Sequence, residues 1–152
     1  MTIRCEIVSQ DRMVFEGDAD IVVVPGALGE MGILPGHAPL LSALDLGVIR
    51  VKMGQEEEIF TVTGGFIEVQ PDIVTIMADA AENVEEIDVE RARQAMERAE
   101  RLLDEYSEED TENYLRIQAA LRRSNLRLKT VDQYRRRGQR SRPPGMGTSQ
   151  SQ

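Results

Sequence analysis

Residues 73–106 read IVTIMADAAENVEEIDVERARQAMERAERLLDEY, and the spacing of the apolar residues changes within this stretch. Up to Ala78 the residues form a short apolar run rich in β-branched side chains, which is typical of a buried strand. From Val89 onward, apolar residues recur at steps of three and four, which predicts a helix with one apolar face. Asp88 stands directly before that helix and is a good N-cap residue. The stretch therefore separates a β part of the chain from an α part.

Toward the N-terminus, the sequence breaks into short apolar or alternating runs that are separated by Gly, Pro and Asp. This pattern predicts strands over residues 3–8, 20–24, 48–53, 58–63, 66–70 and 73–78. The pair Pro71-Asp72 is a turn signal, because proline presets φ and cannot continue a ladder of backbone hydrogen bonds. So many short strands within roughly 80 residues predict a β-sandwich or flattened barrel, which we assign to residues 1–84.

Toward the C-terminus, a second apolar stripe runs from Tyr114 to Val131, with Ser124 where another apolar residue would fit. Two helices joined by a short acidic loop predict an antiparallel two-helix hairpin over residues 85–138. Several stripe positions hold alanine, which buries little area, so we expect a modest hold on the sandwich and a mobile hairpin. Residues 139–152 have no periodicity and are expected to form a disordered tail.

The charge of the chain is divided unevenly along its length. The 152 residues carry 18 Lys+Arg and 27 Asp+Glu, a formal net charge of −9, which argues against a surface built for nucleic acid. By segment, the formal charge is −10 over residues 1–84, −8 over residues 85–112 and +9 over residues 113–152. The chain is therefore an acidic body with a basic end.

Composition also excludes several kinds of chemistry. Cys5 and His37 are the single members of their kinds, which excludes a disulfide and a Cys/His metal site. The chain has neither a G-x-S-x-G nor a G-x-x-x-x-G-K-[ST] motif, so we expect no catalysis and no required cofactor. No apolar run approaches the roughly 20 residues that cross a bilayer, and no secretory signal precedes the strands. These features predict a soluble protein that starts in the cytoplasm.

The segment of residues 29–41, GEMGILPGHAPLL, holds three glycines and two prolines within eleven residues and so prescribes a particular backbone path. Together with LGVIRV at residues 46–51, GGFIEV at residues 64–69 and IVTIMAD at residues 73–79, it resembles the epsilon subunit of bacterial F-type ATP synthase. The resemblance covers residues 3–131.

The resemblance implies a non-catalytic rotor subunit that couples the gamma stalk to the c ring in proton-driven ATP synthesis. The sandwich is expected to bind gamma and to rest on the ring of c subunits, through the loop that holds Glu30 and His37. Without the resemblance, Glu30 reads as a solvated carboxylate and His37 as a hydrogen-bonded structural residue. The expected location is the cytoplasmic face of the bacterial cell membrane, where the complex alone provides the membrane contact.

A second signal is Ile87-Asp88-Val89-Glu90-Arg91-Ala92, which matches the I/L-D-x-x-R-A motif of family members whose hairpin binds one ATP. Arginines seven apart on the first helix and four apart on the second share a helix face, and guanidinium forks suit phosphate oxygens. The resemblance implies that the base and ribose meet Glu82, Ile87, Asp88 and Ala92, and the phosphates Arg91, Arg98, Arg123 and Arg127. Alternatively, these arginines form a solvated face that pairs with Glu90, Glu97 and Glu100. Because the chain lacks a Walker loop, any ATP bound here is expected to act as a regulatory signal and not to be hydrolysed.

The second helix is basic, and dense positive charge favours an anionic partner. By resemblance, the extended helix meets the beta and alpha subunits of the catalytic head and inhibits hydrolysis through Arg116, Arg122, Arg123, Arg127 and Lys129. Bound ATP is then expected to favour the folded hairpin, and the hairpin is expected to extend when the ATP concentration falls. One alternative is a nucleotide-independent rotor scaffold, and another is an unrelated sandwich module with a basic tail. Nucleic acid is not an expected partner, because few aromatic residues accompany the charge.

Overall fold

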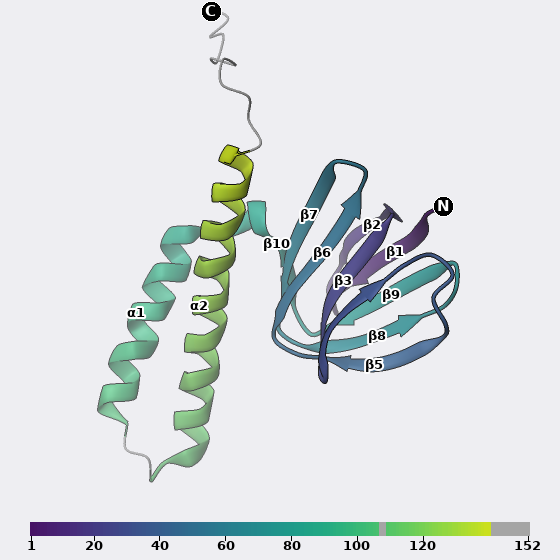
Figure 1. The fold of residues 1–152 in the computed structure, drawn as a ribbon. Helices are drawn as coiled ribbons and strands as arrows, with labels where there is room; N and C mark the ends of the chain where they lie inside the picture. The colour runs from purple at the N-terminus through teal and green to yellow at the C-terminus, as the bar shows by residue number, and fades with distance from the viewer. Residues whose placement is uncertain (107–108, 141–152) are drawn as a thin grey trace, which may run out of the picture.

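The computed structural model describes residues 1–106 and 109–140, the last six of these by their backbone alone (Figure 1). In this part of the chain, a β-sandwich precedes two long helices. The elements are β1 (Ile3–Val8), β2 (Met13–Ala19), β3 (Ile21–Gly26), β4 (Gly29–Ile33), β5 (Leu40–Leu44), β6 (Gly47–Met53), β7 (Glu56–Val62), β8 (Gly65–Val69), β9 (Ile73–Ala78), β10 (Ala81–Asn83), the 3-10 helix η1 (Val84–Glu86), α1 (Val89–Glu105) and α2 (Thr111–Arg140).

The strands form one sheet that folds over on itself. Its order is β10-β7-β6-β3-β5-β8-β9-β1-β2, with β4 paired to β3. Neighbours are antiparallel except for β1 and β9, which run parallel. Phe15 on β2 and Phe60 on β7 belong to strands near opposite ends of this order, yet their ring centroids are 5.5 Å apart. The two ends of the sheet therefore meet, which confirms the predicted sandwich or flattened barrel.

The core lies inside this folded sheet and follows the two-residue period of the strands. In β1, Ile3, Cys5 and Ile7 are fully buried, while the residues between them are partly exposed. Phe60 and Ile76 come from other strands and are at most 1% exposed. Burial raises the pKa of the Cys5 thiol to about 12, so this side chain packs as a small apolar group.

The sequence reading missed four strands, β2, β4, β5 and β10. Their burial patterns show why: β4 and β5 each bury a single residue, Ile33 and Leu44, and β10 has three half-buried residues. These three strands show little of the alternation that marks a half-buried strand, and β2 contains Gly17 and Asp18, two residue types that are depleted in strands. Another correction concerns β3, which was expected to end before Pro25 but continues to Gly26 in a ladder with β4.

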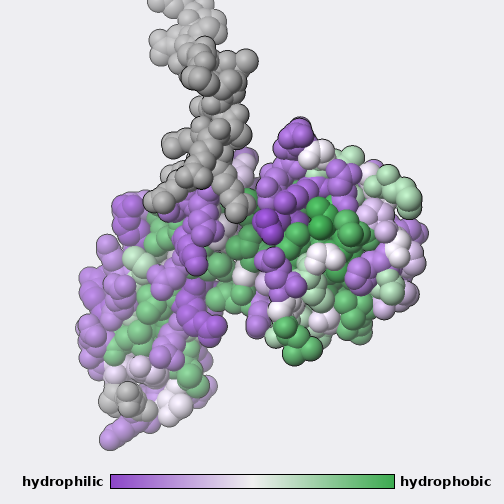
Figure 2. Space-filling model, in the orientation of Figure 1, coloured by the Kyte–Doolittle hydropathy of each residue, from purple (hydrophilic) through white to green (hydrophobic). Residues whose placement is uncertain are grey.

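The two helices pack side by side as the predicted antiparallel hairpin, with α2 between α1 and the sandwich (Figure 1). Asp88 caps α1 as predicted, because its side chain accepts a hydrogen bond of 3.1 Å from the backbone N–H of Arg91. Ala92, Ala99 and Ser124 are buried in the hairpin. Figure 2 shows hydrophilic residues over most of the hairpin and broader hydrophobic areas on the sandwich.

The hairpin touches the sandwich mainly through α2. A small apolar cluster joins the two parts and consists of Ile59, Val84, Ile87 and Val131, with Val48, Val89 and Tyr134 packed against it. α2 begins at Thr111, three residues before the predicted stripe, and its described backbone ends at Arg140. Most of the predicted tail, residues 141–152, lies outside the described residues. None of the helices in the described part of the chain has an apolar stretch long enough to span a membrane.

Candidate functional site

A cavity of about 390 Å³ lies where β10, η1 and the first turns of α1 meet α2. Its size is within the range of roughly 300–1,000 Å³ that is usual for small-molecule sites. The cavity is lined by Glu82, Glu86, Ile87, Asp88, Arg91, Ala92, Ala95, Arg98 and Arg127. Seven of the eight residues that the sequence nominated for ATP are therefore brought together at one place, and Arg123 is the exception.

The cavity wall combines apolar and cationic groups. Ile87, Ala92 and Ala95 supply apolar surface, which suits a planar, uncharged group. Three guanidinium groups, from Arg91, Arg98 and Arg127, supply planar donors that match phosphate or carboxylate oxygens. The arrangement can thus contact a ligand that carries both an apolar ring and a multiply charged anionic group.

The pairing of the cavity arginines differs from one arginine to the next. Within residues 1–106 and 109–134, neither Arg91 nor Arg98 has a carboxylate at ion-pair distance. Glu90, which the alternative reading offered as a partner, lies 3.3 Å from Arg93 instead. Both guanidinium groups are exposed on the cavity wall and keep their donors available for a ligand.

The carboxylates at the cavity already have partners. Asp88 caps α1, as described above, and Glu86 lies 3.2 Å from the guanidinium of Arg12. The Glu82 Oε1 atom lies 2.5 Å from Nε of Arg127, which links β10 to α2. Arg127 is thus the arginine of the cavity that carries an internal counter-ion.

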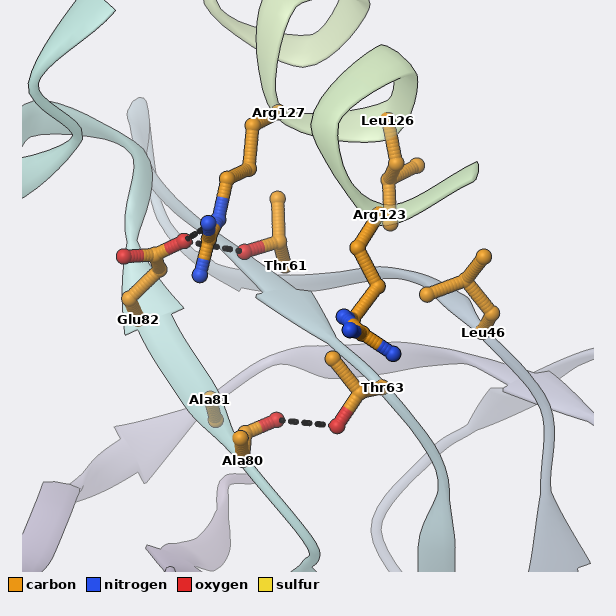
Figure 3. Close-up of a pocket in the computed structure, with 9 residues that line it drawn as sticks. All are labelled: Leu46, Thr61, Thr63, Ala80, Ala81, Glu82, Arg123, Leu126 and Arg127. Carbon is orange, nitrogen blue, oxygen red and sulfur yellow. Dashed lines mark hydrogen bonds and ion pairs between the residues drawn. The ribbon is translucent and has the colours of Figure 1, made fainter. Parts of the chain in front are cut away.

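Arg123 lines a separate, smaller pocket of about 80 Å³ on the sandwich side of α2 (Figure 3). Its guanidinium extends toward Thr63, whereas that of Arg127, one turn further along, lies against Glu82 and Thr61. Glu82 and Arg127 line both this pocket and the larger cavity, so their ion pair forms part of the wall between them. The four arginines do not converge on one point in this structure.

The other basic residues of α2 are spread around the helix. Arg122 is exposed at the rim of a cavity shared with Phe66 and Asp79, and Arg116 lies 3.9 Å from Glu112 in an exposed ion pair. Lys129 is also exposed. The five residues nominated for inhibition therefore form no single patch in this conformation: Arg122, Arg123 and Arg127 line pockets between α2 and the sandwich, whereas Arg116 and Lys129 line neither of these pockets.

Glu30 and His37 lie at opposite ends of the segment that was nominated for the c ring. Glu30 is the second residue of β4, and its Oε1 atom is 3.6 Å from the Arg50 guanidinium. His37 follows the end of β4 by four residues, and its Nδ1 atom lies 2.7 Å from the carbonyl oxygen of Ala38. The backbone of this turn is held by a 2.8 Å hydrogen bond from the Gly36 N–H to the Pro71 carbonyl oxygen.

The sequence reading missed an apolar row on the outer face of the sandwich. The residues are neighbours in the strand register across β5, β8, β9, β1 and β2: Ala43, Phe66, Met77, Val8 and Met13. Phe66 is 55% exposed, which is unusual for a large aromatic side chain unless it meets a partner. The alternation in residues 66–69 indicates that Phe66 and Ile67 lie on opposite faces of the sheet. The sequence does not show that residues from four other strands join Phe66 in one row. We call these five residues the apolar row.

Similarity to known protein families places the chain in a class of two-domain subunits. The family described as ATP synthase, Delta/Epsilon chain, beta-sandwich domain matches residues 2–84, and the corresponding long alpha-helix domain matches residues 85–132. The ATP synthase epsilon chain of Halalkalibacterium halodurans is 46% identical over 84% of this chain and 95% of its own length. The ATP synthase epsilon chain of Dehalococcoides mccartyi is 44% identical over 90% of this chain and 97% of its own length. The chain belongs to the ATP synthase epsilon chain family.

Solved structures show the same fold at greater distance. A chain of the Euglena gracilis mitochondrial ATP synthase, in an assembly of OSCP, F1 and c-ring, superposes with a TM-score of 0.69 at 23% identity. That match covers 88% of this chain and 81% of the other. A chain of the Tetrahymena thermophila mitochondrial ATP synthase central stalk and c-ring gives a TM-score of 0.54 at 11% identity, over 86% and 97%. At these identities, the likeness is one of fold.

Proposed function

We propose that this chain is a central-stalk subunit of ATP synthase whose helical hairpin binds ATP and controls ATP hydrolysis. The observation that supports ATP binding is the cavity in which Asp88, Arg91, Arg98 and Arg127 come together beside apolar surface. Arg91 and Arg98 have no ion pair within the described side chains, so a triphosphate meets donors that are free to bind it. ATP is a regulatory ligand in this proposal and not a substrate.

The proposed control is a two-state equilibrium of the hairpin. In the docked state α2 lies on the sandwich and closes one side of the cavity, so ATP binds this state and stabilises it. The gain is RT ln(1 + [L]/Kd), about 2.7 kcal/mol at a hundredfold excess over Kd. In the extended state the basic residues of α2 meet the beta and alpha subunits of the catalytic head and inhibit hydrolysis. A fall in ATP therefore favours inhibition.

The sandwich has a separate proposed task, which is to join the gamma subunit to the c ring in proton-driven ATP synthesis. The apolar row suits a permanent interface with gamma, because Phe66 and Met77 are 55% and 43% exposed beside one another. Glu30 on β4 and the turn that carries His37 are proposed to meet the c ring on the cytoplasmic face of the cell membrane. A Phe66→Glu chain that still assembles with gamma at wild-type affinity would contradict this assignment.

A second candidate is a nucleotide-independent rotor scaffold. Two observations favour it: Arg127 is already neutralised by Glu82, and Arg123 lies outside the cavity. In this case the hairpin packs or inhibits without regard to ATP, and the available arginines meet other subunits or solvent.

The experiment that separates the two candidates is a calorimetric titration of ATP into the full chain. The test variant is Arg91→Ala, and the matched control is Arg93→Ala, since Arg93 lies on the same helix, pairs with Glu90 and does not line the cavity. We expect one-to-one binding that Arg91→Ala weakens at least about tenfold, the effect of losing a charged hydrogen bond. Arg93→Ala is expected to bind like the wild type. Absence of binding at millimolar ATP would favour the scaffold.

A further inference from the structure

Arg50 on β6 lies between two carboxylates that belong to different parts of the sandwich. Its guanidinium is 3.6 Å from Oε1 of Glu30 on β4 and 3.8 Å from Oε1 of Glu57 on β7. Both distances exceed the roughly 2.7–2.9 Å of a charge-assisted hydrogen bond. The Arg50 side chain is 26% exposed, so it is partly shielded from water. The guanidinium is therefore shared loosely by two anions and is bound tightly by neither.

The two carboxylates differ in how well they are satisfied. The Oε1 atom of Glu57 is buried and has no hydrogen-bond partner among the described residues. A buried oxygen without a donor keeps a desolvation cost that a hydrogen bond would remove. A shift of about 1 Å would bring the Arg50 guanidinium within hydrogen-bond distance of this atom. Glu30 is 69% exposed and attracts the same guanidinium from the other side of β6.

This group of charges lies on the surface that α2 covers. Arg50 and Glu30 line a cavity of about 520 Å³ that Tyr134 of α2 helps to enclose. Glu57 and Glu85 line a second pocket, of about 280 Å³, with the same tyrosine, whose hydroxyl donates a 2.8 Å hydrogen bond to Glu85. Docking of α2 thus takes water away from Glu57. A carboxylate that loses water without gaining a donor disfavours the docked state, and a closer Arg50 offsets this cost.

We propose that Arg50 is a two-position switch that transmits engagement of Glu30 to the hairpin. When a partner binds the Glu30 carboxylate, Arg50 moves onto Glu57 and the docked state of α2 is favoured. The inference rests on the proposed contact of Glu30 with the c ring, which supplies such a partner. A sandwich that is seated on the ring consequently holds its hairpin docked more firmly than a free chain does.

The alternative role for Arg50 is a fixed clamp that joins β4, β6 and β7. A clamp loses one contact when the Glu30 charge is removed, so the surface beneath α2 loosens or stays as it was. A switch gains a contact, because Arg50 is released to satisfy the buried oxygen of Glu57. The sign of the change in docking therefore separates the two roles.

The experiment measures hydrogen exchange of the α2 amides in the full chain, with Glu30→Gln as the mimic of an engaged Glu30. We expect exchange to slow about two- to threefold, together with slower exchange of the Arg50 guanidinium protons by NMR. In a Glu57→Gln background the same substitution is expected to change neither, since Arg50 then has no second carboxylate to bind. The matched control is Glu68→Gln, which removes one exposed negative charge that contacts Gln70 and is expected to behave like the wild type.

Unchanged or faster exchange of α2 in Glu30→Gln would assign Arg50 to the clamp and overturn the inference. Equal slowing in Glu68→Gln, or slowing that persists in the Glu57→Gln background, would attribute the effect to net charge and would also overturn it. The c-ring contact is tested separately, by binding of the wild type and Glu30→Ala to the detergent-solubilised ring. Equal affinities would contradict that contact while the switch measured in the free chain stands.

Discussion

The sandwich and the hairpin bury very different side chains. The sandwich core contains large groups with almost no exposure, among them Phe60, Ile67 and Ile76. The buried positions of the hairpin are Ala92, Ala99, polar Ser124 and Thr130, and a single larger apolar residue, Val131, which packs in the cluster with the sandwich. Apolar burial contributes roughly 25 cal/mol per Å², so an alanine provides a small part of what an isoleucine or phenylalanine provides. This contrast agrees with the proposal that the sandwich stays folded while the hairpin exchanges its packing partners with a small loss of free energy.

The largest test of this contrast is Phe60→Ala in the sandwich. Phe60 is 1% exposed and packs edge to face on Phe15, so its removal leaves a cavity between two ends of the sheet. We expect the free energy of unfolding to fall by about 4 kcal/mol in a urea titration. The control is Phe66→Ala, which removes the same side chain from a position that is 55% exposed and is expected to cost below about 1 kcal/mol. Equal losses would contradict the core assignment.

A smaller effect is expected in the hairpin from Ala99→Leu. Ala99 is 4% exposed in the hairpin, so a leucine there has to separate the helices. Overpacking of this kind costs about 2 kcal/mol, and we expect it as faster hydrogen exchange in α1 and α2 with unchanged exchange in β1 and β9. Gln94→Leu adds the same side chain on an exposed position of α1 and is the control. Equally faster exchange throughout the sandwich core in Ala99→Leu would show that the two parts unfold as one.

The sequence predicted what depends on local periodicity and missed what depends on pairing across the fold. The cap at Asp88 and the common face of Arg91 and Arg98 follow from the helical repeat alone, and both are confirmed. The position of Arg123 depends on where α2 packs against the sandwich, which no spacing specifies. The contact between Glu82 and Arg127 joins residues 45 positions apart and arises in the same way.

The missing strands have a comparable cause. β4 and β5 are held by ladders to β3 and β8, while Ile33 and Leu44 are their single buried side chains. Their extended conformation is thus imposed by neighbours that already form strands, and the sequence alone shows little of it. The apolar row escaped notice for the same reason, because its five members are adjacent only after the register of five strands is known.

The smallest effect concerns Tyr134, which makes a polar contact between α2 and η1. The hydrogen bond to Glu85, followed by burial and the nearby carboxylates, raises the pKa of Tyr134 above its usual value. The neutral phenol is therefore favoured in the docked state, and its contribution is complete below the ordinary tyrosine pKa and lost as pH rises through the raised one.

We accordingly expect the undocked fraction of hairpins to rise less than about threefold between about pH 9 and pH 11. The measurement is the distance between spin labels at Lys129 on α2 and Gln55 in the β6–β7 turn, both of which are exposed. Tyr134→Phe keeps the ring in the apolar cluster but cannot ionise, so its docking is expected to be insensitive to pH over this range. The same pH dependence in Tyr134→Phe would assign the effect to other groups and leave Glu82 and the apolar cluster as the contacts that hold α2.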